Sequence, residues 1–270
     1  MMRTVPLALS IALLAGGARA ASLDRTQIND LFSQAKDLFR RANALADSDP
    51  AGARDLYQKA ALRFERIARD GRVHNGRLYY NIANTYFRMG DIGRAILYYR
   101  YAERTIPNDP NLQQNLSYAR SRRVDQVEEA ERTRVLKTLF FWHYDLPSRT
   151  RLAVFALGFA AVWLCAIGRL FSRRALLAWG IGVSVAVSVL MGGSLLADEI
   201  GRARHVPGVV LAEEAVARRG DSETYQPMFE EPLHAGTEFE LVEDRGEWLH
   251  VELADGRRCW LPATAAGVVR

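Results

Sequence analysis

The sequence predicts a multi-domain chain with a set of all-α helical hairpins, a membrane hairpin of two helices and a small all-β barrel. Three observations support this prediction. Two apolar runs, Leu152–Phe171 and Ala175–Leu196, are separated only by Ser172, Arg173 and Arg174. Before them the apolar residues recur at steps of three and four, and after them they alternate, as expected for helices and strands respectively.

The expected boundaries follow these changes in pattern. A signal peptide is expected over residues 1–20, a helical domain over 21–120, and a charged helical stalk with an aromatic segment at the bilayer interface over 121–149. The transmembrane helices are expected over 150–171 and 175–197, and the barrel over 206–270.

Composition excludes some classes of function. The net charge of +5 comes from scattered arginines and not from a Lys/Arg run, which argues against nucleic-acid binding. Cys165 lies in an apolar run and Cys259 near the C-terminal end, so no disulfide between them is expected. No Cys/His cluster has metal-ligand spacing, and we expect no cofactor.

The N-terminal segment has the three parts of a secretory signal peptide. Arg3 precedes the apolar stretch Val5–Ala15, and small residues lead to an expected cleavage after Ala20. An uncleaved signal anchor is the alternative interpretation. In both cases the residues that follow are exported.

Five helices are expected before the membrane hairpin. They are 23–45, 50–70, Arg77–Met89, Ile92–Thr105, and one that starts at Pro110 and continues to Lys137. Asp49 is placed to cap the second helix, with Pro50 at its first position. Gly90 and Asp91 separate the third helix from the fourth.

Gly76–Asp109, a segment of 34 residues, has the spacing of a repeat. The residues in phase with that repeat are Tyr79, Ile82, Ala83, Tyr86, Ala95, Tyr99, Ala102 and Pro107. In this spacing the segment resembles a tetratricopeptide repeat, although an unrelated helical hairpin is the alternative. Its neighbours match less well, through Ala53, Tyr57 and Ala60 before it and Leu112, Leu116 and Ala119 after it.

The resemblance implies a concave groove lined by the first helix of each unit. The groove positions fall on Arg77, Tyr80, Asn84, Phe87 and Arg88, and then on Gln114, Tyr118 and Arg122. Arginine suits a carboxylate, aromatic rings suit apolar side chains, and Asn84 resembles the asparagine with which peptide-binding members hold a peptide backbone. Alternatively, Tyr80 and Phe87 pack against neighbouring helices and Asn84 is a solvated polar residue.

The membrane hairpin fixes the topology. Each apolar run is about long enough to cross a bilayer core of roughly 30 Å, and a hairpin leaves both flanking parts on one side. The aromatic residues of Leu139–Tyr144 suit the bilayer interface. Arg169, Arg173 and Arg174 favour a cytoplasmic turn. Arg149 and Arg151 flank the outer end and argue slightly against this, but the exported N-terminal segment places both soluble parts outside the cytoplasm.

The C-terminal part alternates in Glu238–Leu241 and Trp248–Leu253, with turn signals at Gly246 and Gly256. It resembles bacterial SH3 domains in Ala217–Ser222, Gly236-Thr237, Gly246–Val251, Asp255-Gly256 and Cys259–Pro262, although that family usually has Gly where Cys259 stands. Trp248, Trp260 and Tyr225 belong either to the core of the barrel or to an exposed aromatic surface.

The order of these parts, together with the run Leu78–Arg100, resembles the BatE-type proteins of bacterial aerotolerance operons. The resemblance implies membrane proteins with von Willebrand factor A domains as partners and, indirectly, a MoxR-type AAA+ ATPase. We find no enzyme constellation and expect a non-catalytic adapter of the inner membrane that binds proteins through the groove and the SH3-like domain. The alternative is a cell-wall sensor whose SH3-like domain binds peptidoglycan, and an enzyme with an unrecognised site is a third hypothesis.

Overall fold

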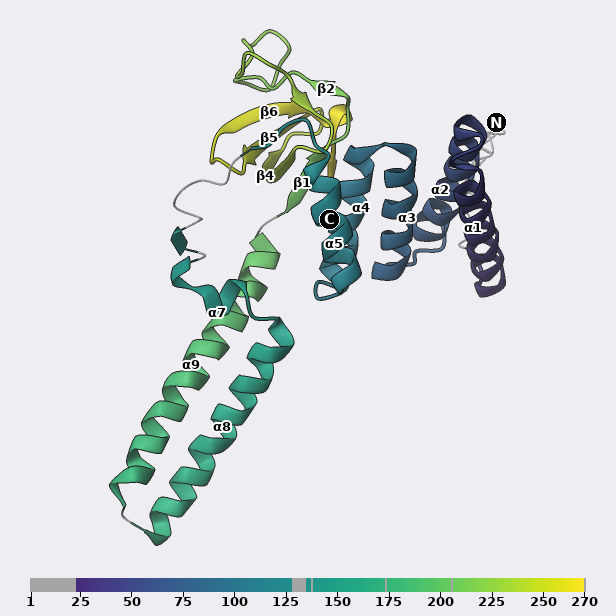
Figure 1. The fold of residues 1–270 in the computed structure, drawn as a ribbon. Helices are drawn as coiled ribbons and strands as arrows, with labels where there is room; N and C mark the ends of the chain where they lie inside the picture. Colours follow the sequence, from purple (N-terminus) through teal and green to yellow (C-terminus); the bar gives the residue numbers. More distant parts are fainter. Residues whose placement is uncertain (1–22, 128–134, 137, 173, 205, 270) are drawn as a thin grey trace, which may run out of the picture.

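The computed structural model describes residues 23–127, 135–136, 138–172, 174–204 and 206–269. The predicted signal peptide therefore lies outside the described residues. Figure 1 shows a hairpin of two long helices that projects from a body in which antiparallel helices lie beside a β-sheet.

The helical module comprises α1 (Arg25–Leu45), α2 (Pro50–Arg69), α3 (Gly76–Met89), α4 (Ile92–Thr105) and α5 (Pro110–Ser121). The sequence signals at their ends act as predicted. The Asp49 carboxylate accepts a hydrogen bond from the Gly52 N–H and Pro50 is the first residue of α2. Gly90 ends α3 with a φ of 81°, which only glycine adopts without strain.

Antiparallel helix pairs form the core of this module, α1 with α2 and α3 with α4. Ala83 and Ala95 are fully buried, so the backbones of α3 and α4 approach closely. Pro107 is exposed, but the other residues placed on the helical repeat are buried as well: Tyr79, Ile82, Tyr86, Tyr99 and Ala102, with Ala53, Tyr57, Ala60, Leu112, Leu116 and Ala119 in the neighbouring helices. The predicted helical pairs are thus confirmed.

The predicted long fifth helix is wrong, because α5 ends at Ser121 and residues 122–127 are not helical. A contact distant in sequence accounts for the difference. The Asp125 carboxylate accepts hydrogen bonds from the His234 N–H at 2.7 Å and the Thr237 hydroxyl at 2.6 Å. These bonds hold the chain against the β module, in a direction that a continued helix would not take.

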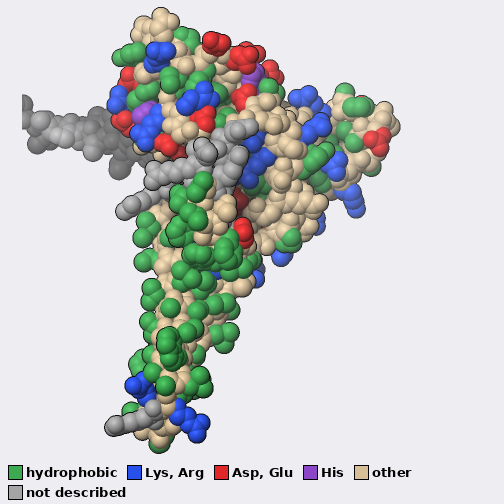
Figure 2. All heavy atoms as spheres, turned by 60° about the vertical axis from the view of Figure 1, so that its left-hand side comes forward, with side chains coloured by type: hydrophobic (Ala, Val, Ile, Leu, Met, Phe, Trp, Pro, Cys, Tyr) green, Lys and Arg blue, Asp and Glu red, His purple; other side chains and the backbone are tan. Residues whose placement is uncertain are grey.

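The hairpin consists of α8 (Ser148–Phe171) and α9 (Ala175–Arg204), preceded by the short helix α7 (Phe141–Tyr144). Both long helices are long and apolar enough to cross a membrane. Their apolar side chains are largely exposed, and Figure 2 shows hydrophobic side chains along the hairpin, with basic side chains at its turn. Such a surface indicates an apolar environment and not the interior of a soluble core.

Small and polar residues lie between α8 and α9. A Cβ added at Gly158 would approach the Ser188 hydroxyl to 2.9 Å, and one at Gly180 would approach the Cys165 sulfur to 3.0 Å. At the end near the soluble body, Arg151 is buried and forms an ion pair with Asp198. Small residues thus let the two helices approach closely, and Cys165 and Cys259 are both free thiols.

The β module was predicted to be a small SH3-like barrel, but it does not form a closed barrel. Its strands are β1 (Pro207–Val210), β2 (Glu214–Ala215), β3 (Leu233–His234), β4 (Glu238–Asp244), β5 (Trp248–Leu253), β6 (Arg258–Pro262) and β7 (Ala266–Val268). Among the described residues, one open antiparallel sheet has the order β6-β5-β4-β1-β7, and β2 pairs with β3. At the two edges of this sheet, Arg218 bridges to Trp260 of β6, and α4 contacts β7. The mixed α and β architecture is confirmed; the closed barrel is wrong.

The helical and β modules contact each other although the hairpin separates them in sequence. A Cβ added at Gly93 of α4 would meet the Val210 carbonyl oxygen at 2.8 Å, so the helix and β1 are in close contact. The Tyr101 hydroxyl donates to the Val268 carbonyl oxygen at 2.8 Å. The two soluble parts therefore form one body on the same side of the hairpin (Figure 1).

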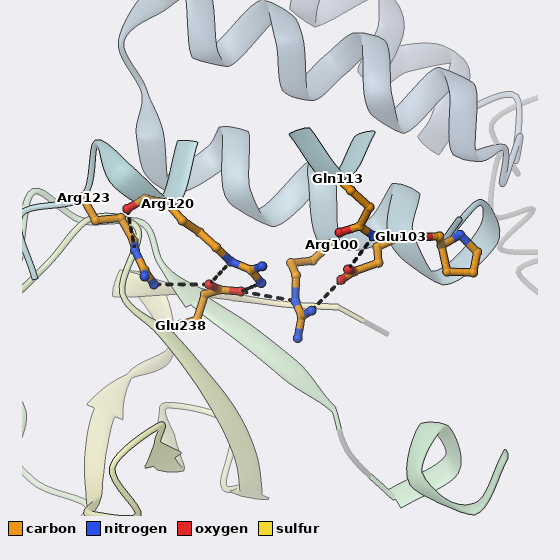
Figure 3. Close-up of polar contacts among 7 residues, drawn as sticks. Arg100, Glu103, Gln113, Arg120, Arg123 and Glu238 are labelled. Carbon is orange, nitrogen blue, oxygen red and sulfur yellow. Dashed lines mark hydrogen bonds and ion pairs between the residues drawn. The ribbon is translucent and has the colours of Figure 1, made fainter. Parts of the chain in front are cut away.

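The carboxylate of Glu238, which is largely buried, forms ion pairs across this interface. Glu238 of β4 accepts a bidentate hydrogen bond from the Arg120 guanidinium, at 2.7 and 2.8 Å. Arg123 donates to it at 3.2 Å, and Arg100 forms an ion pair with it at 3.3 Å (Figure 3). Burial alone would raise the pKa of Glu238, but these arginines outweigh it and hold the pKa below its ordinary value.

Candidate functional site

A hollow of about 720 Å³ lies between α1 and α3, and of the predicted groove residues only Asn84 is among those that line it. Its floor is aromatic, because Phe32 and Phe64 meet edge to face with ring centroids 5.7 Å apart. Its polar lining residues are mostly neutral, and the basic Arg40 among them is paired with Asp37. The lining residues are Phe32, Ser33, Lys36, Asp37, Phe39, Arg40, Asn43, Phe64, Asn81 and Asn84.

Asn84 lines this hollow but is neither free nor simply solvated. Its Oδ1 accepts hydrogen bonds from the Tyr99 hydroxyl at 2.7 Å and from the Asn115 amide at 3.0 Å. Burial raises the pKa of Tyr99 well above its ordinary value, so this phenol remains a proton donor to Asn84. Both bonds use the carbonyl oxygen of Asn84, and within the described residues no hydrogen bond engages its amide group, which has two donor hydrogens.

The predicted aromatic positions belong to the contact between α3 and its neighbours. Tyr80 lies 6.1 Å from Tyr99 between ring centroids, and its hydroxyl accepts from Asn115 at 2.8 Å. Phe87 and Tyr118 form a tilted pair at 5.5 Å, in which Phe87 is half-buried and Tyr118 is 55% exposed. Of these rings, Tyr118 presents the most surface to solvent.

The predicted arginines are spread over the module and do not form one site. Arg77 lies at the start of α3 and Arg88 near its end, about 16 Å apart along a helix that rises 1.5 Å per residue. Arg88 lines a smaller hollow between α2 and α3, of about 250 Å³. Arg122 lines another, between the helical and β modules, of about 500 Å³. The structure thus brings Asn84 to the main hollow and places Arg88 and Arg122 beyond its end.

Sequence reasoning missed the contribution of α1, which is not among the predicted groove positions. The hollow is lined by Lys36 and Asn43 of α1 and by Asn81 of α3. Asn43 also accepts a hydrogen bond from the Tyr57 hydroxyl at 2.6 Å. A usable signal was present in Phe32 and Phe39, seven residues apart on one face of α1 and both half-buried.

The β module carries a second candidate surface. Trp260 stacks on His250 with ring centroids 4.6 Å apart, and the Arg245 guanidinium lies 4.6 Å from the same ring. Trp248 and Trp260 are partly exposed and Tyr225 is 49% exposed, so none of the three belongs to the buried core of the module. Of the two interpretations of these aromatic residues, the structure favours the exposed surface.

The described residues bring together no group of three or more His, Cys, Asp or Glu side chains that could hold a metal ion. The buried thiol of Cys259 is not an activated nucleophile, because burial raises its pKa to about 12. The arrangement of the hollow suits recognition of an extended chain, with aromatic side chains below and amide groups at the rim.

Comparison with known proteins gives no assignment. No family model matches the chain, and neither a curated protein nor a solved structure matches it.

Proposed function

We propose that this protein is a non-catalytic, membrane-anchored adapter that binds an extended segment of a protein partner in the hollow between α1 and α3. The observation that carries the proposal is the hollow itself, with its phenylalanine floor and its rim of Asn81 and Asn84 amides. Amide side chains satisfy the N–H and C=O groups of an extended backbone, while the aromatic floor accepts an apolar side chain. This combination provides affinity without requiring a catalytic group.

The exposed apolar hairpin supports the role of an anchor. By its resemblance to tetratricopeptide proteins and to BatE-type proteins, we place the chain in a bacterial inner membrane with both soluble modules in the periplasm. The partners are then membrane proteins with von Willebrand factor A domains. A MoxR-type AAA+ ATPase in the cytoplasm is reached only through them, because Ser172–Arg174 leaves almost nothing on that side.

Two substitutions in the hollow test the proposal. Lys36→Ala with Asn81→Ala changes the lining of the hollow and removes no hydrogen bond described for either side chain. Asn84→Ala is less suitable, because it also breaks the bonds to Tyr99 and Asn115. The matched control is Gln58→Ala with Leu62→Ala, two exposed residues of α2 that do not line the hollow.

The assay is co-purification of membrane partners from the native host, with helicity and membrane insertion checked for each variant. We expect the variant of the hollow to lose the partner and the α2 variant to retain it. Retention by both variants would overturn the assignment of the hollow.

Cell-wall binding is the second candidate, and the partly exposed Trp248, Trp260 and Tyr225 favour it. Aromatic faces of this kind bind sugar rings or peptide side chains. The full chain in detergent would then sediment with purified sacculi, and Trp260→Ala would reduce the pelleted fraction. If the wild-type chain stays in the supernatant, this candidate is removed.

A further inference from the structure

The turn between α3 and α4 is surrounded by arginines of α2, α3 and α4 and of the C-terminal end of α5. Arg88 and Arg54 line the hollow between α2 and α3, and Arg54 also lines the hollow at the β module, together with Arg94 and Arg122. We call Arg54, Arg88, Arg94 and Arg122 the arginine patch. Its shared member Arg54 shows that the two hollows adjoin.

Most of the patch lacks an opposite charge. Arg94 pairs with Asp91 at 2.7 Å and lies over the Tyr86 ring at 5.6 Å. For Arg54, Arg88 and Arg122, by contrast, no side-chain ion pair or hydrogen bond occurs within the described part of the chain. Other titratable groups beside the patch are Glu213, which is exposed, and His234, which is engaged with Asp125. The patch therefore has an excess of positive charge and exposed guanidinium groups.

The position of the patch bears on whether its ligand is a lipid headgroup or another anion. Figure 1 shows the α3–α4 turn at the end of the helical module that points away from the hairpin. The 14 residues of α3 separate this turn from the opposite end by about 21 Å, roughly two Debye lengths at physiological salt. A patch on this side does not face the headgroups of the membrane that holds the protein.

We propose that the arginine patch binds an acidic peptide segment of the partner, adjacent to the part held between α1 and α3. The inference deepens the proposed function and rests on it, because it adds a charge preference to a protein ligand. Guanidinium groups bind carboxylates by paired, directional hydrogen bonds. The guanidinium groups of Arg54, Arg88 and Arg122 have no partner carboxylate within the described residues, so each of them can bind one carboxylate of the peptide. Binding of this kind is weakened by salt.

The test uses the full chain in phosphatidylcholine nanodiscs and a fluorescein-labelled peptide of eight glutamates, followed by anisotropy. The variant is Arg54→Gln with Arg88→Gln and Arg122→Gln. The matched control is Arg25→Gln with Arg72→Gln and Arg219→Gln, which removes the same charge from exposed positions outside the patch. Circular dichroism verifies the fold of both.

We expect the glutamate peptide to bind and a peptide of eight glutamines not to bind. The patch variant should lose about tenfold in affinity and the control less than twofold, as expected for a few exposed charge pairs. Equal losses in both variants would overturn the proposal. Competition with other anions provides a second criterion. If phosphatidylglycerol vesicles or an eight-nucleotide dT strand displace the labelled peptide at a lower concentration of negative charge than unlabelled glutamate peptide does, the proposal is overturned too.

The outcome is separable from that of the proposed function. If the glutamate peptide does not bind while Lys36→Ala with Asn81→Ala still loses the partner, only the arginine patch is wrongly assigned. If the peptide binds as expected while that variant keeps its partner, the hollow is wrongly assigned.

Discussion

Replacing Glu238 by glutamine should release the contact between the helical and β modules. The carboxylate is 18% exposed and engages Arg100, Arg120 and Arg123. Glutamine keeps the size of the side chain but removes its charge, which leaves three guanidinium groups close together at the interface. Breaking a buried ion pair by removing one partner costs about 3–5 kcal/mol; with the partial exposure of Glu238, we expect about 2–4 kcal/mol.

Hydrogen exchange of the full chain in nanodiscs measures this loss locally. If opening of the interface becomes easier by that amount, protection of the amides in β1 and α5 should fall by about 30- to 1,000-fold. Glu252→Gln is the control, because its pair with Arg258 is much more exposed and should contribute less than about 1 kcal/mol. Unchanged protection in β1 and α5 would refute the view that Glu238 holds the two modules together.

Three further predictions concern the same architecture. Burial would raise the pKa of Asp125, but the hydrogen bonds from His234 and Thr237 lower it below its ordinary value. Its contribution to stability is therefore complete above about pH 5 and falls progressively at lower pH, until it is lost as the pH drops through this lowered pKa. Asp125→Asn should flatten the acid limb of the melting temperature against pH. Gly93→Ala should loosen the contact of α4 with β1 by about 1–3 kcal/mol, because the new methyl group meets the backbone of Val210; unaltered exchange in β1 would contradict this. Arg151→Met should remove the ion pair with Asp198 that joins α8 to α9 and so lower the thermal stability in detergent by several degrees, whereas exposed Arg149→Met should not.

Local signals made much of the fold predictable. Asp49 and Pro50 fix the start of α2, and Gly90 fixes the end of α3, because each feature acts within a few residues of its own position. The hairpin was equally predictable, because its length and its lack of charge are properties of a continuous segment of the sequence. Each of these features depends only on neighbouring residues.

The remaining features depend on residues far apart in sequence. The end of α5 is decided by bonds from Asp125 to His234 and Thr237, 109 and 112 residues away. The strand order of the open sheet and the contact of α4 with β7 are likewise not encoded by the alternation in the strands. In the candidate site, Asn84 was found by its spacing, but its bond to Asn115 and the neighbouring α1 wall required the packed structure.

Photo-crosslinking in the native host tests the central claim most directly. A benzoylphenylalanine placed at Asn81 in the hollow should form an adduct with one membrane protein, and the same residue at exposed Leu62 of α2 should not. An adduct from position 81 alone is the result that the adapter function predicts. No adduct from position 81, or the same adducts from both positions, would contradict it.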